Sequence, residues 1–370
     1  MMIPKHMRAV VLTGYGGLDK LEYREDWPVP IPERDEVLIQ VGACGINNTD
    51  INTRIGWYSK SVTEGTTESR GRTGYSLDAQ AASGWGGSGV SFPRIQGADV
   101  CGRVVALGAG ALQSLMGKRV LIDTWIRDWS DPDNVDKCRY FGSEVDGGFA
   151  EYTKAPVKNV HSVDSDFSDA DLATFATSSI TAENMLRRAN VKKHDVVLVP
   201  GASGGVGSAL IQLARRRGAI PVAMCGDSKA EQVRAIGADA VLPRSPKNLA
   251  SALEAAIGSP HVDVVADVVG GELWPQLIEC LRRGGRYTCA GAIAGPMVSL
   301  DLRTFYLNNL VFTGATIIPP GLFAELVDYI ERKEIKPLLA RAWPLKSLRE
   351  AQEAFLKKQH VGNFVIVPNQ

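Results

Sequence analysis

The sequence has no surplus of either charge, because 41 lysines and arginines balance 41 aspartates and glutamates. Binding to nucleic acid or to an anionic membrane surface is favoured by a basic surplus, so we expect neither partner. Runs of about 18 apolar residues are absent, so no membrane span is expected, and the N-terminus lacks the apolar core and cleavage site of a signal peptide. We therefore expect a cytoplasmic protein.

Closely spaced cysteines are absent as well. The six cysteines form no C-x-x-C pair and have no spacing typical of a zinc site: they are Cys44, Cys101, Cys138, Cys225, Cys280 and Cys289. Reduced thiols are the ordinary state of cysteines in the cytoplasm. The chain has 370 residues, of which 45% are hydrophobic and 22% charged, so it is long enough and apolar enough for two globular domains.

The pattern of apolar residues divides the chain into two domains. Up to residue 160, short runs typical of β-strands are interrupted by glycine and proline. Within 161–314, apolar strands alternate with helical stretches, which is typical of an α/β domain with a parallel sheet covered on both faces. Residues 315–370 contain two amphipathic helices and a strand, and we expect them to return to the first domain, 1–160.

Residues 59–92 form a separate feature. They are rich in glycine, serine and threonine, and they include Trp85. We predict no secondary structure for them. A long loop of this kind inside a compact domain is uncommon and often serves as a lid or a binding loop. A surface insertion without such a role is the alternative.

The strongest local motif is a glycine turn between a strand at 196–200 and a helix at 208–217. Glycines in such a turn let the backbone approach a pyrophosphate, which then lies at the N-terminus of the helix. Because a second strand and helix follow, the motif predicts a doubly wound Rossmann domain that binds a dinucleotide; a tight turn without a ligand is the alternative. The residues of the turn are Gly201, Ala202, Ser203, Gly204, Gly205, Val206 and Gly207.

The end of the next strand distinguishes the two nicotinamide cofactors. An acidic residue there would bind the ribose 2′-hydroxyl of NADH, whereas cations suit the 2′-phosphate of NADPH. Cys225 and Gly226 occupy the tip of the strand, and Asp227, Ser228 and Lys229 follow. Ser228 and Lys229 suit a phosphate near Gly226, so we predict NADPH, with NADH as the alternative. The other interpretation of Lys229 is a solvated residue in the first turn of a helix.

Several segments together resemble a known family. They are 42–50 (GACGINNTD), 97–102 (GADVCG), 147–152 (GGFAEY), the glycine turn, 267–271 (DVVGG) and 284–287 (GGRY). These segments are similar to the medium-chain dehydrogenase/reductase superfamily over nearly the whole chain after Met7. The resemblance implies a GroES-like β-barrel domain beside the Rossmann domain, with the active site in the cleft between them. Many members are dimers or tetramers, and strand pairing through the apolar segment 310–313 would make a homodimer.

The resemblance also locates the ligand positions of zinc-dependent members. Those members carry a cysteine, a histidine beside a glutamate, and a second cysteine; this chain has Asn47, Ala98 beside Asp99, and Thr177. A catalytic zinc needs three ligands of the histidine, cysteine or carboxylate type, and Cys44 and Asp99 alone do not supply them. The family's four-cysteine structural lobe is missing too. We therefore expect no zinc.

Without zinc, the chain is similar to the quinone oxidoreductase and enoyl-thioester reductase branches. Residues 47–58 read NNTDINTRIGWY and resemble the enoyl reductase pattern N-P-S-D-I-N-x-x-x-G-x-Y, whose final tyrosine is implicated in catalysis and corresponds to Tyr58. Quinone reductases often carry a tyrosine there too, so the match does not separate the branches. Asn48 in place of proline, and the insertion after Tyr58, depart from the pattern.

Reduction by hydride suggests roles for two residues. Hydride addition β to a carbonyl moves negative charge to the carbonyl oxygen, which needs a hydrogen-bond donor or a proton. Tyr58 is the candidate donor, with Asn47 as its candidate partner. The alternatives are that Tyr58 only packs against the substrate and that Asn47 satisfies the backbone of a turn.

Further cofactor contacts follow from the resemblance and from the ends of strands. The resemblance places Thr181 near the nicotinamide ribose. Dinucleotides lie at the edge of the sheet where the strands end. The candidate contacts at these strand ends are Val268, Val269, Ala292 and Ile293, for which ordinary packing is the alternative.

The leading hypothesis is a zinc-independent, NADPH-dependent enzyme that reduces a quinone or the activated C=C bond of an α,β-unsaturated carbonyl compound or thioester. The alternatives are an alcohol or aldehyde dehydrogenase of the same superfamily and a nicotinamide-binding protein without turnover.

Overall fold

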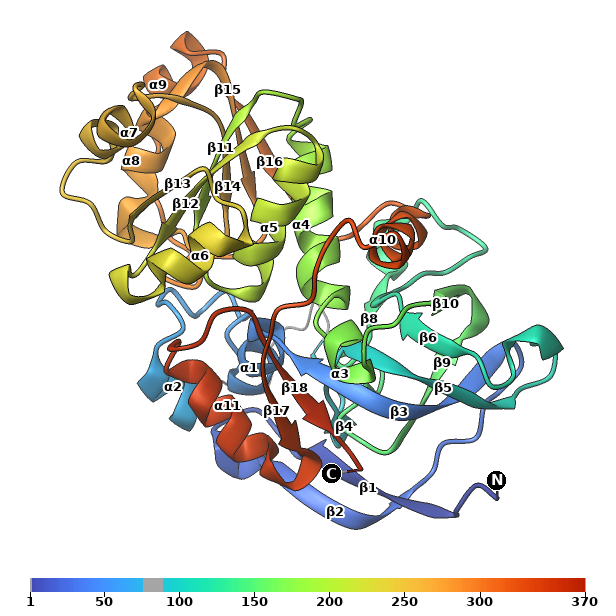
Figure 1. Cartoon of the computed structure of the whole chain (residues 1–370). Helices are drawn as coiled ribbons and strands as arrows, with labels where there is room; N and C mark the ends of the chain where they lie inside the picture. Colours follow the sequence, from blue (N-terminus) through green and yellow to red (C-terminus); the bar gives the residue numbers. More distant parts are fainter. Residues whose placement is uncertain (1, 76–88, 370) are drawn as a thin grey trace.

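The computed structural model describes residues 2–75 and 89–369, so Trp85 lies outside the described residues. Figure 1 shows a helix-covered sheet in the middle of the sequence and a mainly β body built from both ends of the chain. Helix α4 (Ala176–Arg188) lies between these two domains. In the described part of the chain, no helix combines the length and the apolar character needed to cross a membrane.

The first domain contains a sheet of seven strands. Six of them have the order β10-β6-β5-β3-β18-β17, and β9 also pairs with β3. Because β18 pairs antiparallel with β3, the end of the chain completes the sheet of this domain. The strands are β3 (Glu36–Ile46), β5 (Asp99–Leu107), β6 (Arg119–Ile122), β9 (Tyr152–Pro156), β10 (Val160–Ser162), β17 (Leu339–Pro344) and β18 (Asn363–Val367).

Smaller elements surround this sheet. A three-stranded sheet has the order β2-β1-β4, and β7 pairs with β8. The strands are β1 (His6–Leu12), β2 (Leu21–Pro28), β4 (Arg94–Ile95), β7 (Trp125–Ile126) and β8 (Arg139–Tyr140). The helices are α1 (Asn48–Ile55), α2 (Glu68–Thr73), α3 (Asp169–Leu172) and α11 (Leu348–Leu356).

The second domain is a sheet of six parallel strands in the order β13-β12-β11-β14-β15-β16. Its strands are β11 (Val196–Pro200), β12 (Ile220–Cys225), β13 (Ala240–Pro243), β14 (Val262–Asp267), β15 (Leu281–Cys289) and β16 (Val311–Gly314). Its helices are α5 (Gly205–Arg216), α6 (Ala230–Ile236), α7 (Leu249–Ile257), α8 (Trp274–Glu279) and α9 (Leu302–Leu307). This arrangement confirms the predicted doubly wound parallel sheet.

The valine-rich strands are explained by burial on both faces. Side chains alternate between the two faces of a strand. Val197 and Val199 of β11 belong to the apolar cluster under α4 and α5, whereas Leu198 belongs to the cluster under α7 and α8. A strand covered on both sides has no position at which a polar side chain would reach water, so the apolar run is continuous.

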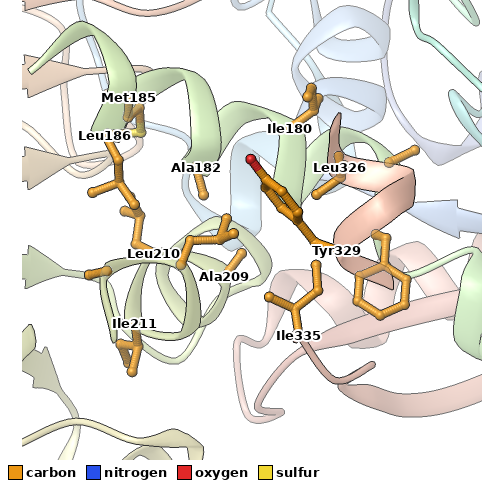
Figure 2. Packing of buried hydrophobic residues seen from close by; sticks show 14 of the residues in the cluster. Ile180, Ala182, Met185, Leu186, Ala209, Leu210, Ile211, Leu326, Tyr329 and Ile335 are labelled. Atoms are coloured by element: carbon orange, nitrogen blue, oxygen red, sulfur yellow. The ribbon is translucent and has the colours of Figure 1, made fainter. Parts of the chain in front are cut away.

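Helix α10 (Leu322–Glu331) extends the packing around α4 and α5. Figure 2 shows Leu326 and Tyr329 of α10 beside Ile180 of α4 and Ala209 of α5. The cluster is buried, and burial of each large apolar side chain contributes about 1.5–3 kcal/mol. The segment that follows the second domain is therefore anchored on that domain before the chain returns to the first.

Two expectations about local structure are wrong. The apolar run 262–269 predicts a strand of that length. Strand β14 instead ends at Asp267, because its carboxylate accepts hydrogen bonds from the backbone N–H groups of Val269 (2.7 Å) and Gly270 (3.1 Å) and so turns the chain. Segment 59–92 contains helix α2, which begins where the hydroxyl of Thr67 accepts a hydrogen bond from Arg70 N (3.1 Å).

Candidate functional site

The glycine turn has the backbone geometry that a dinucleotide site requires. Gly201 has a φ of +69°, in the left-handed region that favours glycine. A Cβ on Gly207 would lie 2.3 Å from the carbonyl oxygen of Gly201, so only glycine allows α5 to approach the turn this closely. The N-terminus of α5 follows Gly204 and offers its free N–H groups and its dipole to an anion. The remaining turn residues are Ala202, Ser203, Gly205 and Val206.

Lys229 points back to this turn and is not the solvated residue of the alternative interpretation. Its ammonium donates to the hydroxyl of Ser203 (3.4 Å) and to the carbonyl of Lys358. Burial lowers the pKa of Lys229, and the nearby charge of Arg244 lowers it further. Ser228 lies beside it in the short helix that follows Gly226. A phosphate near Lys229 would relieve this accumulation of positive charge.

Lys358 is a cation of this region that the sequence did not reveal. Its side chain donates a 2.7 Å hydrogen bond to the amide oxygen of Asn48, and its backbone has a φ of +51°. Burial and the charge of Lys229 lower the pKa of Lys358 to about 7. The two lysines are 129 residues apart in the sequence, so no local pattern could have paired them.

The opposite end of the predicted cofactor site lies at the carboxyl edge of the sheet. Val268, Val269, Ala292 and Ile293 are half-buried there, and the N–H of Ile293 donates to Val268 (3.4 Å). Thr66 N donates to the carbonyl of Ile293 (2.8 Å), so the segment after α1 reaches across to this edge. Residues 64–66 therefore connect the two domains beside the place where a nicotinamide would lie.

The positions that carry zinc ligands in zinc-dependent relatives form a hydrogen-bonded cluster here. Asn47 Nδ2 donates to Asp99 Oδ2 (3.0 Å). The backbone N–H of Thr177 donates to Asp99 Oδ1 (2.7 Å), and the Thr177 hydroxyl bonds the same oxygen. Ala98 offers no ligating atom. Both oxygens of Asp99 are therefore engaged by protein groups.

These residues do not fit a zinc ion. Amide, hydroxyl and methyl groups occupy the ligand positions, and zinc prefers thiolate, imidazole and carboxylate. Burial raises the pKa of the Cys44 thiol, which therefore stays protonated. Across the ranges 2–75 and 89–369, no three histidine, cysteine, aspartate or glutamate side chains gather as a metal site would require.

The carboxylates of the cluster titrate near neutrality. Burial raises the pKa of Asp99 to about 6, although hydrogen bonds from Thr177 and Asn47 lower it. Burial also raises the pKa of Asp50 to about 7, although the backbone N–H groups of Asn47 (2.7 Å) and Gly97 (3.2 Å) donate to its carboxylate. Burial raises the pKa of Asp123, outside this cluster, to about 6 as well, so the pairing of Asp50 with Asp99, and not the raised pKa alone, distinguishes the cluster.

Tyr58 and Asn47 lie in the same region but take different partners. The hydroxyl of Tyr58 donates to Thr49 Oγ (3.4 Å), and the ring packs edge-on against Trp57. Burial raises the pKa of Tyr58, so the phenol keeps its proton. Asn47 precedes α1, where its backbone N–H bonds Asp50, and its amide bonds Asp99. Among the described contacts, the structure brings Asn47 to Asp99 and not to Tyr58.

Tyr140 is a second phenol that sequence reasoning missed. Its hydroxyl shares a 2.9 Å hydrogen bond with Thr177 Oγ, and its ring packs edge-on against Trp125. Thr181 follows Thr177 by four residues on α4, so both face the same side of the helix. Tyr140 and Thr177 are 37 residues apart, and only the packing of β8 on α4 brings them together.

Known proteins resemble this chain over both domains. The model of the alcohol dehydrogenase GroES-like domain matches residues 33–165, and that of the zinc-binding dehydrogenase matches residues 205–332. A solved structure from Sinorhizobium meliloti 1021, described provisionally as an alcohol dehydrogenase, is 46% identical, with 99% of this chain and 97% of that chain covered and a TM-score of 0.88.

Two curated relatives extend the comparison. Human (Homo sapiens) quinone oxidoreductase is 26% identical over 94% of this chain and 94% of its own length. The NAD-dependent alcohol dehydrogenase of Sulfurisphaera tokodaii is 25% identical over 98% of this chain and 100% of its own length. The relatives named here include both quinone and alcohol chemistry, so similarity alone does not choose between them.

Proposed function

The chain belongs to the medium-chain dehydrogenase/reductase superfamily, with a GroES-like domain and a Rossmann domain, and from this premise we propose that it is an NADPH-dependent oxidoreductase that works without zinc. Its substrates in this proposal are quinones or the activated C=C bonds of α,β-unsaturated carbonyl compounds or thioesters. The observation that carries the proposal is the bonding of Asp99 to Asn47 and Thr177, which fills the ligand region with protein hydrogen bonds.

The preference for NADPH is supported by the charges near the glycine turn. Lys229 lies against Ser203, and Lys358 lies next to Lys229. Within the described ranges, no carboxylate forms a salt bridge with either lysine. A 2′-phosphate near Lys229 and Ser228, with the pyrophosphate at the start of α5, would use these charges.

The chain's own residues would stabilise the reaction in the following way. A bound reduced nicotinamide supplies a hydride to the substrate. The developing negative charge lies on the substrate oxygen, and Tyr58, whose phenol stays protonated, donates a hydrogen bond to it. Thr66, bonded to the carbonyl of Ile293, would lie beside the bound nicotinamide at the edge of the sheet.

The named relatives favour a second candidate function. The Sinorhizobium structure is 46% identical and is described provisionally as an alcohol dehydrogenase. Interconversion of an alcohol and a carbonyl compound would use the same cofactor site and the same phenols. The two candidates differ in the acceptor that the enzyme reduces.

A panel of acceptors distinguishes these functions. NADPH oxidation would be followed by absorbance with a simple quinone, a 2-alkenal, an enoyl-CoA and a saturated aldehyde. Consumption with one of the first three supports the proposed function, and consumption with the saturated aldehyde alone supports the second candidate. Quenching of NADPH fluorescence without consumption in any case would indicate a binding protein instead.

We also propose that the enzyme is a homodimer that pairs through β16. This strand is at the edge of the six-stranded sheet, so its outer N–H and C=O groups are open to another strand. Large apolar side chains are exposed around it, which is typical of an interface: Met297, Val298, Leu302, Tyr306, Leu307 and Val311. A second copy of the chain would cover them and extend the sheet.

A further inference from the structure

Asp99 is a buried carboxyl group that accepts a backbone hydrogen bond in the first turn of α4 and has no part so far in the proposed reaction. It has no exposed surface at the start of β5. No lysine, arginine or histidine forms a salt bridge with it in the part of the chain that the structure describes. Burial of an ionised carboxylate without a cation is unfavourable, and the hydrogen bonds that Asn47 and Thr177 donate to Asp99 offset part of that cost. A group that can gain and lose a proton is therefore buried at this position.

Hydroxyl groups connect Asp99 to the junction between the domains. Thr177 Oγ bonds Asp99 Oδ1, and Tyr140 Oη lies 2.9 Å from Thr177 Oγ. Asn47 donates to the other carboxylate oxygen, Oδ2 (3.0 Å). Each carboxylate oxygen accepts from an N–H group, that of Asn47 or the backbone N–H of Thr177. Among these contacts the Thr177 hydroxyl on Oδ1 is the group that can exchange a proton with Asp99.

The direction of these hydrogen bonds depends on the proton of Asp99. A threonine hydroxyl has one proton to donate. When Asp99 is ionised, Thr177 donates to it and accepts from Tyr140. When Asp99 is protonated, it donates to Thr177, Thr177 donates to Tyr140, and the proton of Tyr140 is directed to another acceptor. The same three groups can thus accept a proton or deliver one.

The Tyr140 end of this series of hydrogen bonds lies between the two domains and near Tyr58, the proposed donor to the substrate. Tyr140 belongs to β8 of the first domain and meets α4, which leads into the second domain. On α4, Thr181 lies one helical turn after Thr177, at the position expected near the nicotinamide ribose. A charge on Tyr58 would raise the pKa of Tyr140, because the two phenols lie in the same region.

We propose that Asp99, Thr177 and Tyr140 form a proton relay to the substrate oxygen, in the place where zinc-dependent relatives hold their metal. The relay rests on the proposed function, which supplies the hydride. Tyr140 would then be a second catalytic residue beside Tyr58, because Tyr140 would give its proton to the substrate oxygen to which Tyr58 donates a hydrogen bond. Thr177 and Asp99 act through Tyr140.

In reduction, a proton passes from Asp99 through Thr177 and Tyr140 to the substrate oxygen. Hydride adds to the electron-poor carbon, the π electron pair moves to the substrate oxygen, and this oxygen forms a bond to the proton of Tyr140. Tyr140 takes the proton of Thr177, and Thr177 takes that of Asp99, which is left ionised. After the product leaves, a proton from water returns to Asp99 along the same groups. Oxidation of an alcohol would use the reverse sequence.

The electrostatics of the cluster suit this role. Burial raises the pKa of Asp99 to about 6, near the pH at which a proton donor works best. The titratable groups that face it are the thiol of Cys44 on β3, the carboxyl of Asp50 on α1 and the phenol of Tyr140 on β8. Burial raises the pKa of all three, so Cys44 and Tyr140 stay neutral and Asp50 alone titrates in a similar range, at about 7. Thr177 of α4 also faces Asp99, but its hydroxyl does not titrate in this pH range.

Kinetics of single and double variants test the relay. Tyr140→Phe keeps the ring packing on Trp125, and Thr177→Val keeps the shape of Thr177, but both remove a hydroxyl. Each should lower kcat for the best acceptor by about 10²-fold with an unchanged KM for NADPH. The double variant should lose no more than either single variant, because both interrupt one path. Thr177→Ser should recover most of the activity lost in Thr177→Val, and Tyr152→Phe on β9 is the matched control.

The pH dependence separates a relay from a structural role. Reduction needs the protonated form of Asp99, so kcat of the wild type should fall as the pH rises above about 6. This fall should disappear in Tyr140→Phe and in Asp99→Asn. An unchanged kcat in the hydroxyl variants, losses that multiply in the double variant, or a fall that persists in Tyr140→Phe would overturn the relay alone. A wild-type protein that consumes no NADPH with any acceptor would instead overturn the proposed function, and the relay with it.

Discussion

The side-chain amide of Asn47 donates a 3.0 Å hydrogen bond to the carboxylate of Asp99. The relationship matters because Asn47 takes the position of a cysteine ligand in zinc-dependent relatives, and Asp99 takes that of the glutamate beside their histidine ligand. With Thr177 on the other oxygen, the carboxylate is fully engaged by uncharged donors. The pocket is thus stabilised by hydrogen bonds, and proton transfer takes the place of a Lewis acid in the proposed reaction.

Removal of the Tyr58 hydroxyl should impair catalysis without unfolding the protein. Tyr58→Phe keeps the ring that packs against Trp57, and the melting temperature, measured beside the rates, shows whether the variant is folded. The loss of a donor to the substrate oxygen should lower kcat about 10²-fold at every pH. Steady-state rates with the best acceptor measure this, with Tyr23→Phe on β2 as the control. Equal kcat values for Tyr58→Phe and the wild type would assign Tyr58 to packing.

Replacement of Lys229 should change the cofactor preference. A charge-assisted bond to a phosphate contributes about 1.5–3 kcal/mol, so Lys229→Ala should raise the KM for NADPH about 10- to 100-fold. The KM for NADH, which lacks the 2′-phosphate, should change little. Lys346→Ala, an exposed lysine remote from the turn, is the matched control. A similar loss for both cofactors would show that Lys229 does not recognise the 2′-phosphate.

A methyl group in the glycine turn should destabilise the second domain. The Cβ of Gly207→Ala would lie 2.3 Å from the carbonyl oxygen of Gly201, so α5 must move. Overpacking of this kind costs about 1–3 kcal/mol, and NADPH binding should weaken as the turn shifts. Gly14→Ala, which meets no atom within 4 Å, should leave the stability nearly unchanged. Urea unfolding and NADPH fluorescence titration measure the two effects. Wild-type behaviour of Gly207→Ala would contradict the close approach.

A charge on β16 should separate the proposed dimer. Val311 is 50% exposed on the edge strand, and an aspartate there would be buried without a partner in the dimer. Light scattering should give about twice the chain mass of 39.8 kDa for the wild type and the single mass for Val311→Asp. Met116→Glu, an exposed apolar residue of the first domain, is the control. A monomeric wild type would refute the dimer.

The sequence predicts those parts of the fold and the site that depend on local pattern. The alternation of apolar strands and helices identifies the parallel sheet, and the spacing of Gly201 and Gly207 identifies the turn, because neighbouring residues determine both. The early end of β14 is different, since it follows from the capture of two backbone N–H groups by Asp267. A side chain that bonds its own backbone leaves no periodic signal.

Tertiary contacts explain why the other site residues could not be predicted. Lys358 approaches Lys229 only because the C-terminal segment returns to the first domain. Tyr140 meets Thr177 only because β8 packs on α4. The sequence located Asn47 through a family resemblance, but it did not show that the partner of Asn47 is Asp99.

The most direct test of the central claim is the rate of NADPH oxidation by protein freed of metal. The protein would be treated with a strong chelator, dialysed, analysed for residual zinc, and assayed with a quinone and a 2-alkenal. Because Asn47, Ala98 and Thr177 supply no zinc ligand set, the rate should equal that of untreated protein, and added zinc should not increase it. A rate that is lost with the metal and restored by zinc would contradict the proposed mechanism.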